Sequence, residues 1–167
     1  MTYSPEEIRK WFEPMRLSKN FTLQEYIKSQ TATRKGLDNT PGPEHLASAT
    51  ELFRNVVQNV RDKFGVTVIN SGYRGPALNE AVGGSSRSQH CKGEAVDIEC
   101  PGTSNYTVAK FIEDNLDYDQ LILEFYTPGI PDSGWVHVSY VSEGNRKQSL
   151  TAMKENGKTV YKPGLIE

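Results

Sequence analysis

The sequence has no apolar run that could cross a membrane, and it has almost no net charge. Its 19 Lys and Arg residues nearly balance 21 Asp and Glu residues, for a formal charge of -2. Nucleic acids and anionic membranes bind basic faces, so this balance argues against both as partners. A bilayer span needs about 20 apolar residues, and the charged start of the chain lacks the basic and then apolar order of a signal peptide. We therefore expect no membrane insertion, and a protein that stays in the cytoplasm unless it is released.

Cysteine and histidine are also scarce. The two cysteines, Cys91 and Cys100, cannot build a disulfide framework, and the sequence does not show whether they pair. A domain of this size buries about 70% of the surface of its unfolded chain, so its core needs neither a disulfide nor a metal. Any metal is therefore expected to serve the function, and each of the three histidines can be weighed by itself.

The composition, 36% hydrophobic and 24% charged, is that of an ordinary globular domain. Apolar residues recur every three or four positions from Pro43 to Phe64, which predicts a long helix that stops at Gly65. Later segments are β-branched or alternate, as strands do. We expect strands at 66–69, 94–99, 120–125 and 135–140, helices at 77–82 and 107–116, and a hairpin around Asn156-Gly157. Helices first and strands later predict an α+β fold, with helices packed on a central antiparallel β-sheet.

Two histidines and an aspartate lie on or beside adjacent predicted strands. His90 comes just before strand 94–99, in which alternation places Asp97 on the face opposite the apolar residues. An aspartate within a strand needs something to satisfy its charge, and a metal ion would do so. His137 also lies opposite the apolar face of its own strand. Two imidazoles and one carboxylate match a catalytic zinc site, which keeps a fourth position for water.

Such a site also needs a base that accepts a proton from water, and a cation or donor that holds the substrate. Glu124 lies among apolar residues near the end of strand 120–125, where burial would raise its pKa toward a useful range. Asp132, in the loop before His137, is the alternative. Arg74 follows a strand and a glycine turn, and its guanidinium could hold a substrate carboxylate in bidentate fashion.

Several of these residues also have an ordinary structural interpretation. Glu124 could be a solvent-exposed carboxylate at the edge of the sheet, and Asp132 an ordinary loop aspartate. His45, in the first turn of the long helix, is expected on the solvated surface. Cys91 is expected to face away from its neighbour His90, so we do not count it as a ligand.

Two motifs identify a resemblance to a known family. Residues 88–97 follow the pattern S-x-H-x-x-G-x-A-x-D, and residues 135–139 read W-V-H-V-S. Together they resemble the M15 zinc peptidases, a group that includes D-alanyl-D-alanine carboxypeptidases and phage L-alanyl-D-glutamate endopeptidases. The resemblance covers roughly residues 18–141, and it is to the single-domain branch that is common in phages.

The resemblance implies that His90, Asp97 and His137 hold one zinc ion per chain, in a fold of the M15 or hedgehog type. It also implies that Arg74 and Ser88 help to bind the substrate. We add Tyr73, which shares the motif of Arg74, to these predicted substrate contacts.

The position of the catalytic base differs among M15 zinc peptidases. Some members carry a carboxylate three residues before the last histidine, where this chain has Gly134. In others the base comes from a Glu-Phe pair that ends the preceding strand, and Glu124-Phe125 match that pattern here. The resemblance therefore favours Glu124, with Asp132 kept as the alternative.

We expect one zinc peptidase domain over residues 1–167. Residues 1–42 would form N-terminal helices and turns, residues 43–141 the catalytic core, and residues 142–167 a C-terminal hairpin extension. The domain would act as a monomer.

The expected activity is hydrolysis of a peptide bond in peptidoglycan stem peptides, with a phage endolysin-type endopeptidase as the leading interpretation. Such an enzyme would stay in the cytoplasm of the host bacterium and act on the cell wall after release. Two alternatives remain open. One is a D-alanyl-D-alanine carboxypeptidase that trims precursors, and the other is a non-catalytic, zinc-containing module that binds the cell wall.

Overall fold

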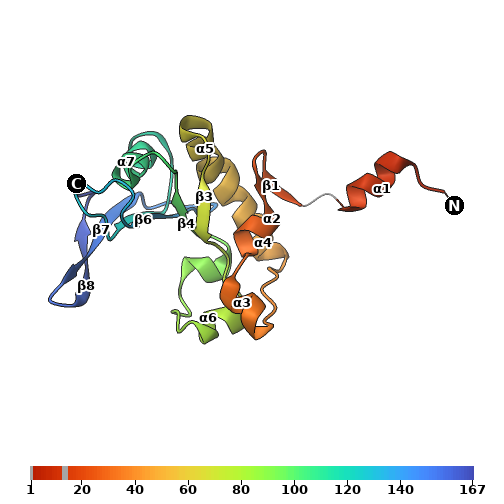
Figure 1. Cartoon of the computed structure of the whole chain (residues 1–167), viewed down its shortest axis with the longest axis horizontal. Helices are drawn as coiled ribbons and strands as arrows, with labels where there is room; N and C mark the ends of the chain where they lie inside the picture. The colour runs from red at the N-terminus through yellow and green to blue at the C-terminus, as the bar shows by residue number, and fades with distance from the viewer. Residues whose placement is uncertain (1, 13–14) are drawn as a thin grey trace.

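A computed structural model describes residues 2–12 and 15–167 of the chain. Several of its helices cover one face of a six-stranded sheet (Figure 1). The helices are α1 (Pro5–Phe12), α2 (Leu23–Ile27), α3 (Gln30–Lys35), α4 (Pro43–Leu52), α5 (Gln58–Phe64), α6 (Pro76–Ala81) and α7 (Asn105–Asn115), with a π-helical turn η1 (Phe53–Val57) and a 3-10 turn η2 (Gln89–Lys92). The strands are β1 (Arg16–Ser18), β2 (Phe21–Thr22), β3 (Val68–Ser71), β4 (Ala95–Glu99), β5 (Gln120–Glu124), β6 (Trp135–Ser139), β7 (Gln148–Glu155) and β8 (Lys158–Pro163).

The predicted long helix is confirmed as α4, η1 and α5, which follow one another without a break. Pro43 occupies the first turn of α4, where the amide hydrogen that proline lacks has no partner in any case. Gly65 ends the helix with a φ of 86°, a conformation that glycine adopts without strain. The later helix α7 begins at Ser104, whose hydroxyl accepts a hydrogen bond from the Thr107 amide.

The main sheet has the strand order β3-β4-β6-β5-β7-β8. Every neighbouring pair is antiparallel except β5 and β7, which are parallel. The α+β class is confirmed, and the sheet is mixed rather than wholly antiparallel. After β6 the chain crosses over β5 and forms β7 on the other side of it. Strand β7 runs in the same direction as β5, and opposite to β6.

The core lies between the helices and one face of the sheet. Alternation turns the apolar residues of the central strands toward α4, η1, α5 and α7, and all of them are fully buried: Val96, Ile98, Leu121, Leu123, Val136 and Val138. The other face of the same strands carries Asp97, Glu124 and His137. Packing of the apolar face thus determines which face is left for the polar residues.

The N-terminal region contains more than the predicted helices and turns. Strands β1 and β2 pair to form a short ribbon, and Thr22 then caps α2 through reciprocal hydrogen bonds with Glu25. Helix α1 lies apart from the rest of the chain (Figure 1). None of the helices in the described residues has the length and apolar character needed to cross a membrane.

The C-terminal hairpin is confirmed around Asn156 and Gly157, which both have positive φ, 51° and 76°. Its strands β7 and β8 extend the main sheet, because β7 pairs with β5 along all five residues of that strand. The division of the chain at residues 42 and 141 stays a prediction.

Candidate metal centre

Strand pairing and the turn η2 bring the three predicted ligands together. Asp97 of β4 lies directly opposite His137 of β6, so both side chains project from the same face of the sheet. The Ser88 hydroxyl caps η2 by accepting a hydrogen bond from the His90 amide, and this bond helps to hold His90 beside the same face of the sheet. The Asp97 Oδ1 atom lies 3.0 Å from Nδ1 of His137 and 3.5 Å from Nε2 of His90.

A hydrogen bond to the backbone fixes the orientation of the His90 ring. Its Nδ1 atom donates a hydrogen bond of 2.8 Å to the Gly72 carbonyl, which leaves Nε2 facing Asp97. Only 4% of His90 is exposed. In zinc sites the second nitrogen of a histidine ligand commonly donates to a carbonyl or carboxylate in this way, because that bond determines the tautomer and orients the ring.

Burial alone would raise the pKa of the Asp97 carboxyl, but hydrogen bonds from His137 and His90 outweigh burial and hold that pKa well below its usual value. Asp97 is therefore ionised and available as an acceptor or a ligand. One nitrogen or oxygen atom from each of His90, Asp97 and His137 lies within 4.8 Å of the others. Two imidazoles and a carboxylate are the donor set of many catalytic zinc sites, so the three residues fit this metal.

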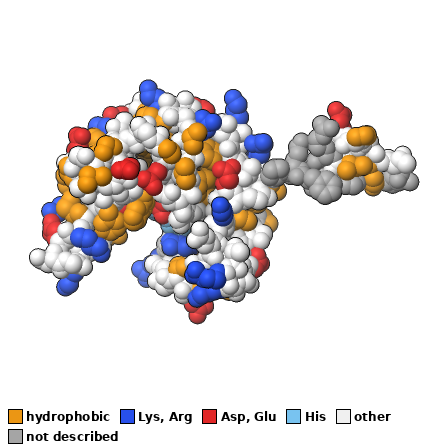
Figure 2. Space-filling view, in the orientation of Figure 1, with side chains coloured by type: hydrophobic (Ala, Val, Ile, Leu, Met, Phe, Trp, Pro, Cys, Tyr) orange, Lys and Arg blue, Asp and Glu red, His pale blue; other side chains and the backbone are white. Residues whose placement is uncertain are grey.

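These three side chains line a cavity of about 500 Å³. Figure 2 shows the surface hollowed between the β7–β8 hairpin and the lobe that carries α3 and α6. The lining residues are Arg74, Arg87, Ser88, Gln89, His90, Asp97, Gln120, Ile122, Glu124, Trp135, His137, Arg146 and Tyr161. Six of these lining residues were predicted from the sequence: the potential ligands His90, Asp97 and His137, the candidate base Glu124, and the candidate substrate contacts Arg74 and Ser88.

Glu124 is the last residue of β5 and faces the same cavity as the ligands. Burial raises the pKa of its carboxyl, the negative charge of Asp97 raises it further, and His137 lowers it. Asp132 is exposed in the loop between β5 and β6 and does not line the cavity. The geometry therefore favours Glu124 over Asp132 as the carboxylate that can reach a water near the ligands.

Arg74 lines the cavity and is hydrogen-bonded to two residues at η2. Its Nη2 atom donates to Ser88 Oγ at 3.1 Å, and its backbone amide donates to the His90 carbonyl. Its Nε atom is buried and has no hydrogen-bond partner among the described residues. Because Arg74 also lines the cavity, the other N–H groups of its guanidinium can donate hydrogen bonds to a substrate carbonyl or carboxylate.

A model of the peptidase M15 family matches residues 19–139, more than two thirds of the chain. This chain belongs to the peptidase M15 family. Membership implies a peptidase. No curated protein matched the sequence. The part shared with the M15 family contains the three potential ligands, Glu124 and Arg74, whereas β7 and β8 lie beyond it.

The M15 motif residue Tyr73 does not reach this cavity. It is buried, and its hydroxyl lies 3.0 Å from Nδ1 of His45. Tyr73 instead lines a second cavity beside β3, which it shares with Arg74, and its predicted substrate contact stays a prediction. His45 is half-buried, whereas the sequence predicted a solvated position. At this point α4 lies against Gly93 so closely that a Cβ atom on Gly93 would be 2.3 Å from the His45 carbonyl oxygen.

Both thiols of this M15 peptidase are free. Cys100 is buried, and Cys91 is half-buried. Cys91 does not line the cavity and does not belong to the potential ligand group among the described residues.

Several cavity residues were missed by the sequence analysis: Arg87, Gln89, Gln120, Ile122, Trp135, Arg146 and Tyr161. Alternation along β5 and β6 could have indicated Gln120, Ile122 and Trp135. Arg87 and Gln89 lie beside or within the motif at residues 88–97, which could have indicated them. Arg146 and Tyr161 have no such signal, because they lie beyond the M15 match and reach the cavity only through the hairpin.

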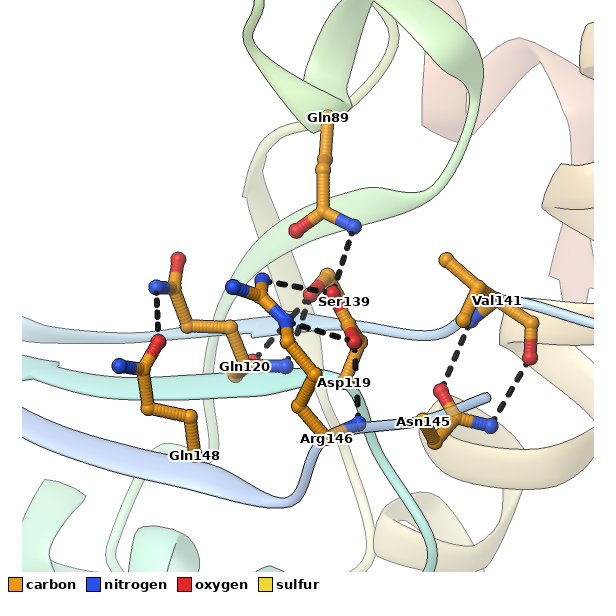
Figure 3. A network of polar contacts seen from close by, with 8 residues as sticks. All are labelled: Gln89, Asp119, Gln120, Ser139, Val141, Asn145, Arg146 and Gln148. Atoms are coloured by element: carbon orange, nitrogen blue, oxygen red, sulfur yellow. Dashed lines mark hydrogen bonds and ion pairs between the residues drawn. The ribbon is translucent and has the colours of Figure 1, made fainter. Parts of the chain in front are cut away.

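Arg146 enters the site through an ion pair with Asp119 (Figure 3). Its Nε and Nη2 atoms donate to the two oxygens of this carboxylate at 3.0 and 2.8 Å. The Gln89 side chain donates to the same carboxylate at 3.0 Å. Asp119 is only 4% exposed, so these bonds satisfy a buried charge while they join η2, β5 and the segment before β7.

Proposed function

We propose that this M15 peptidase uses zinc held by His90, Asp97 and His137 to hydrolyse a peptide bond in the stem peptides of bacterial peptidoglycan. One observation carries the proposal. The potential ligands and the half-buried carboxylate of Glu124 line the same cavity. Family membership supplies the peptidase class, and the geometry supports the metal and the base.

Zinc bound at these residues would polarise the scissile carbonyl and lower the pKa of water toward about 7. Glu124 would take a proton from that water and later give it to the leaving amine. Its raised pKa suits both steps, because a carboxylate with an ordinary pKa holds a proton poorly near neutral pH.

Arg74 and Ser88 would bind and orient the peptide. The Arg74 guanidinium donates to Ser88 through Nη2 and lines the cavity, so its other N–H groups can donate to a substrate oxygen without breaking the existing contact. Binding of this kind positions the scissile bond against the base and the metal.

We further propose an endopeptidase of the phage endolysin type, acting on the wall of the host bacterium. Arg74 also lines a second cavity of about 520 Å³ beside β3. A substrate chain could therefore continue past the reaction centre on this side. A D-alanyl-D-alanine carboxypeptidase is the second candidate, because the Arg74 guanidinium at the cavity is also suited to a free terminal carboxylate.

The test is mass analysis of defined muropeptides and purified sacculi after incubation with the protein, with chelator and after zinc is added back. We expect cleavage within the stem peptide that chelator abolishes and zinc restores. Release of only the terminal D-Ala would indicate the carboxypeptidase. Activity that survives complete metal removal would exclude the zinc mechanism. Binding to sacculi with no cleavage at all would indicate a non-catalytic module.

The assignment of the base is tested by Glu124→Gln and Asp132→Asn side by side. We expect Glu124→Gln to lower kcat by about 10²- to 10⁴-fold, the usual contribution of a general base, while one zinc per chain remains bound. Asp132→Asn is the matched control, since this side chain is exposed outside the cavity. A normal rate in Glu124→Gln together with a large loss in Asp132→Asn would reverse the assignment.

A further inference from the structure

Phe125, the residue directly after Glu124, has an unusual backbone conformation. Its φ is 56°, in the left-handed region that side chains other than glycine, asparagine and aspartate rarely adopt. A bulky residue persists there only where the surrounding structure holds it, and such residues gather at functional sites. Phe125 lies at the end of β5, immediately beside the cavity.

Contacts from both neighbouring strands hold Phe125 in place. Its amide donates a 2.9 Å hydrogen bond to the Ala152 carbonyl of β7. Its ring lies 5.4 Å from the Trp135 ring of β6, and the Lys154 ammonium of β7 lies 5.6 Å from the ring centre. Two of these three contacts come from the hairpin beyond the part matched to the family.

Gly134 closes the same turn from the other side. It has a φ of 66°, and a Cβ atom placed on it would lie 2.0 Å from the Glu124 carbonyl oxygen and 2.7 Å from the carbonyl carbon of Phe125. Position 134 therefore has no room for any side chain while the backbone of residues 124 and 125 stays as it is. A base three residues before His137 is for this reason incompatible with the observed turn.

The Glu124 carboxylate itself has no side-chain hydrogen bond or ion pair among the described residues. Its direction is thus determined by its own backbone and by packing. Two features fix this backbone at the peptide group between Glu124 and Phe125: the left-handed conformation of Phe125, and the close packing of Gly134 against it.

We propose that Phe125 and Gly134 are positioning residues that keep the Glu124 carboxylate in the cavity through the left-handed turn at the end of β5. The inference rests on the proposed function for its kinetic readout. Neither residue touches the substrate in this account. Loss of the turn should therefore lower kcat, with little change in KM or in bound zinc.

The first experiment compares Gly134→Ala with Gly129→Ala. Both glycines lie in the loop between β5 and β6 with positive φ, 66° and 84°, but a Cβ at Gly129 meets nothing within 4 Å. We expect kcat for muropeptide cleavage to fall at least about 100-fold in Gly134→Ala, as when a general base is lost, with KM within about threefold of wild type. Gly129→Ala, which suffers the same backbone strain without the clash, should keep nearly the wild-type kcat.

The second experiment separates the conformation of Phe125 from its ring, and it decides the matter if Gly134→Ala does not fold. Phe125→Asn and Phe125→Val both remove the ring, but asparagine tolerates the left-handed region and a β-branched valine does not. We expect kcat of the valine variant to fall at least about tenfold below that of the asparagine variant, at equal KM and equal zinc content. Equal kcat values in the two variants would overturn the proposal.

Crystal structures of wild type and of both Phe125 variants provide a readout without turnover. The Glu124 carboxylate should face the cavity in wild type and Phe125→Asn, and it should leave the cavity in Phe125→Val. If wild type cleaves no muropeptide, the proposed function fails, yet these structures still test the positioning role. A carboxylate that stays in place in Phe125→Val would overturn the inference even if the enzyme is active.

Discussion

His90 and Glu124 are held in different ways, and this difference determines how each can act. The ring of His90 is anchored by its bond to the Gly72 carbonyl and is almost completely buried. Glu124 is only half-buried, and its carboxylate has no hydrogen bond among the described residues. A ligand benefits from a fixed position, whereas a base must be free to receive and release a proton.

The raised pKa of Glu124 predicts a pH dependence for catalysis. Burial raises this pKa above the usual value of about 4.3, the charge of Asp97 adds to the effect, and His137 opposes it. A base works in its unprotonated form, so activity is present above the raised pKa and is lost as the pH falls through it. We therefore expect the acid limb of a plot of kcat against pH to lie above the ordinary glutamate value.

The control for this profile is Asp132→Asn, which should keep the limb unchanged. Glu124→Gln should remove it from the residual activity. An acid limb at or below the ordinary glutamate pKa would contradict the role of burial at Glu124.

Between elements, the buried carboxylate of Asp119 joins parts of the chain that the sequence keeps far apart. It accepts hydrogen bonds from Gln89 of η2, and from both the side chain and the backbone amide of Arg146 before β7 (Figure 3). A backbone hydrogen bond from the Gln148 amide to the Asp119 carbonyl adds a further connection between β7 and the start of β5. The hairpin is thus tied to the turn that carries His90, as well as to β5.

We expect Asp119→Asn to lower the free energy of unfolding by about 2 kcal/mol at pH 7, the scale of hydrogen bonds to a charged group. The Arg146 hydrogen bonds hold the pKa of Asp119 below its usual value, although burial partly opposes them. A depressed pKa stabilises the fold above the unfolded-state pKa of about 3.9, and this stabilisation is lost as the pH falls through the folded-state pKa. The deficit of the variant should therefore shrink as the pH falls below about 3.9.

Urea unfolding at several pH values measures this deficit, with Asp132→Asn as an exposed control that should match wild type at every pH. A deficit that stays constant down to the lowest pH at which the protein folds would mean that the charge of Asp119 contributes nothing.

Over the whole molecule, the sheet separates the hydrophobic core from the candidate metal centre. The core lies beneath α4, η1, α5 and α7, and the potential ligands Asp97 and His137 project from the opposite face. Metal binding would therefore add to a fold whose stability comes from elsewhere, unlike a small zinc finger that is unfolded without its metal.

Removal of metal should consequently leave the chain folded at 25 °C but lower its thermal midpoint. Zinc at 100 times its Kd would stabilise the folded state by about 2.7 kcal/mol through mass action. Thermal unfolding followed by circular dichroism, with zinc and with chelator, measures the shift. Asp97→Asn, which weakens the ligand set, should show a smaller shift. Unfolding at 25 °C on chelation alone would instead indicate a structural metal.

Local patterns in the sequence were enough for most elements. The continuous helix from Pro43 to Phe64, the cap at Ser104 and the turn at Asn156-Gly157 depend on neighbouring residues, so periodicity and turn chemistry predict them. The parallel partnership of β5 with β7 was not predictable in this way. It depends on which side of β5 the chain returns to, and residues far apart in the sequence decide that.

The same division holds for the site. Sequence motifs were enough to identify the peptidase family and the three residues that the structure brings together, because both histidines and Asp97 lie in two compact motifs. The tertiary structure places Glu124 but not Asp132 at the cavity, leaves Tyr73 at the neighbouring cavity, and brings Arg146 and Tyr161 to the first one. Whether a side chain reaches a cavity depends on strand register, on the path of the hairpin and on burial, and these arise from contacts between distant segments.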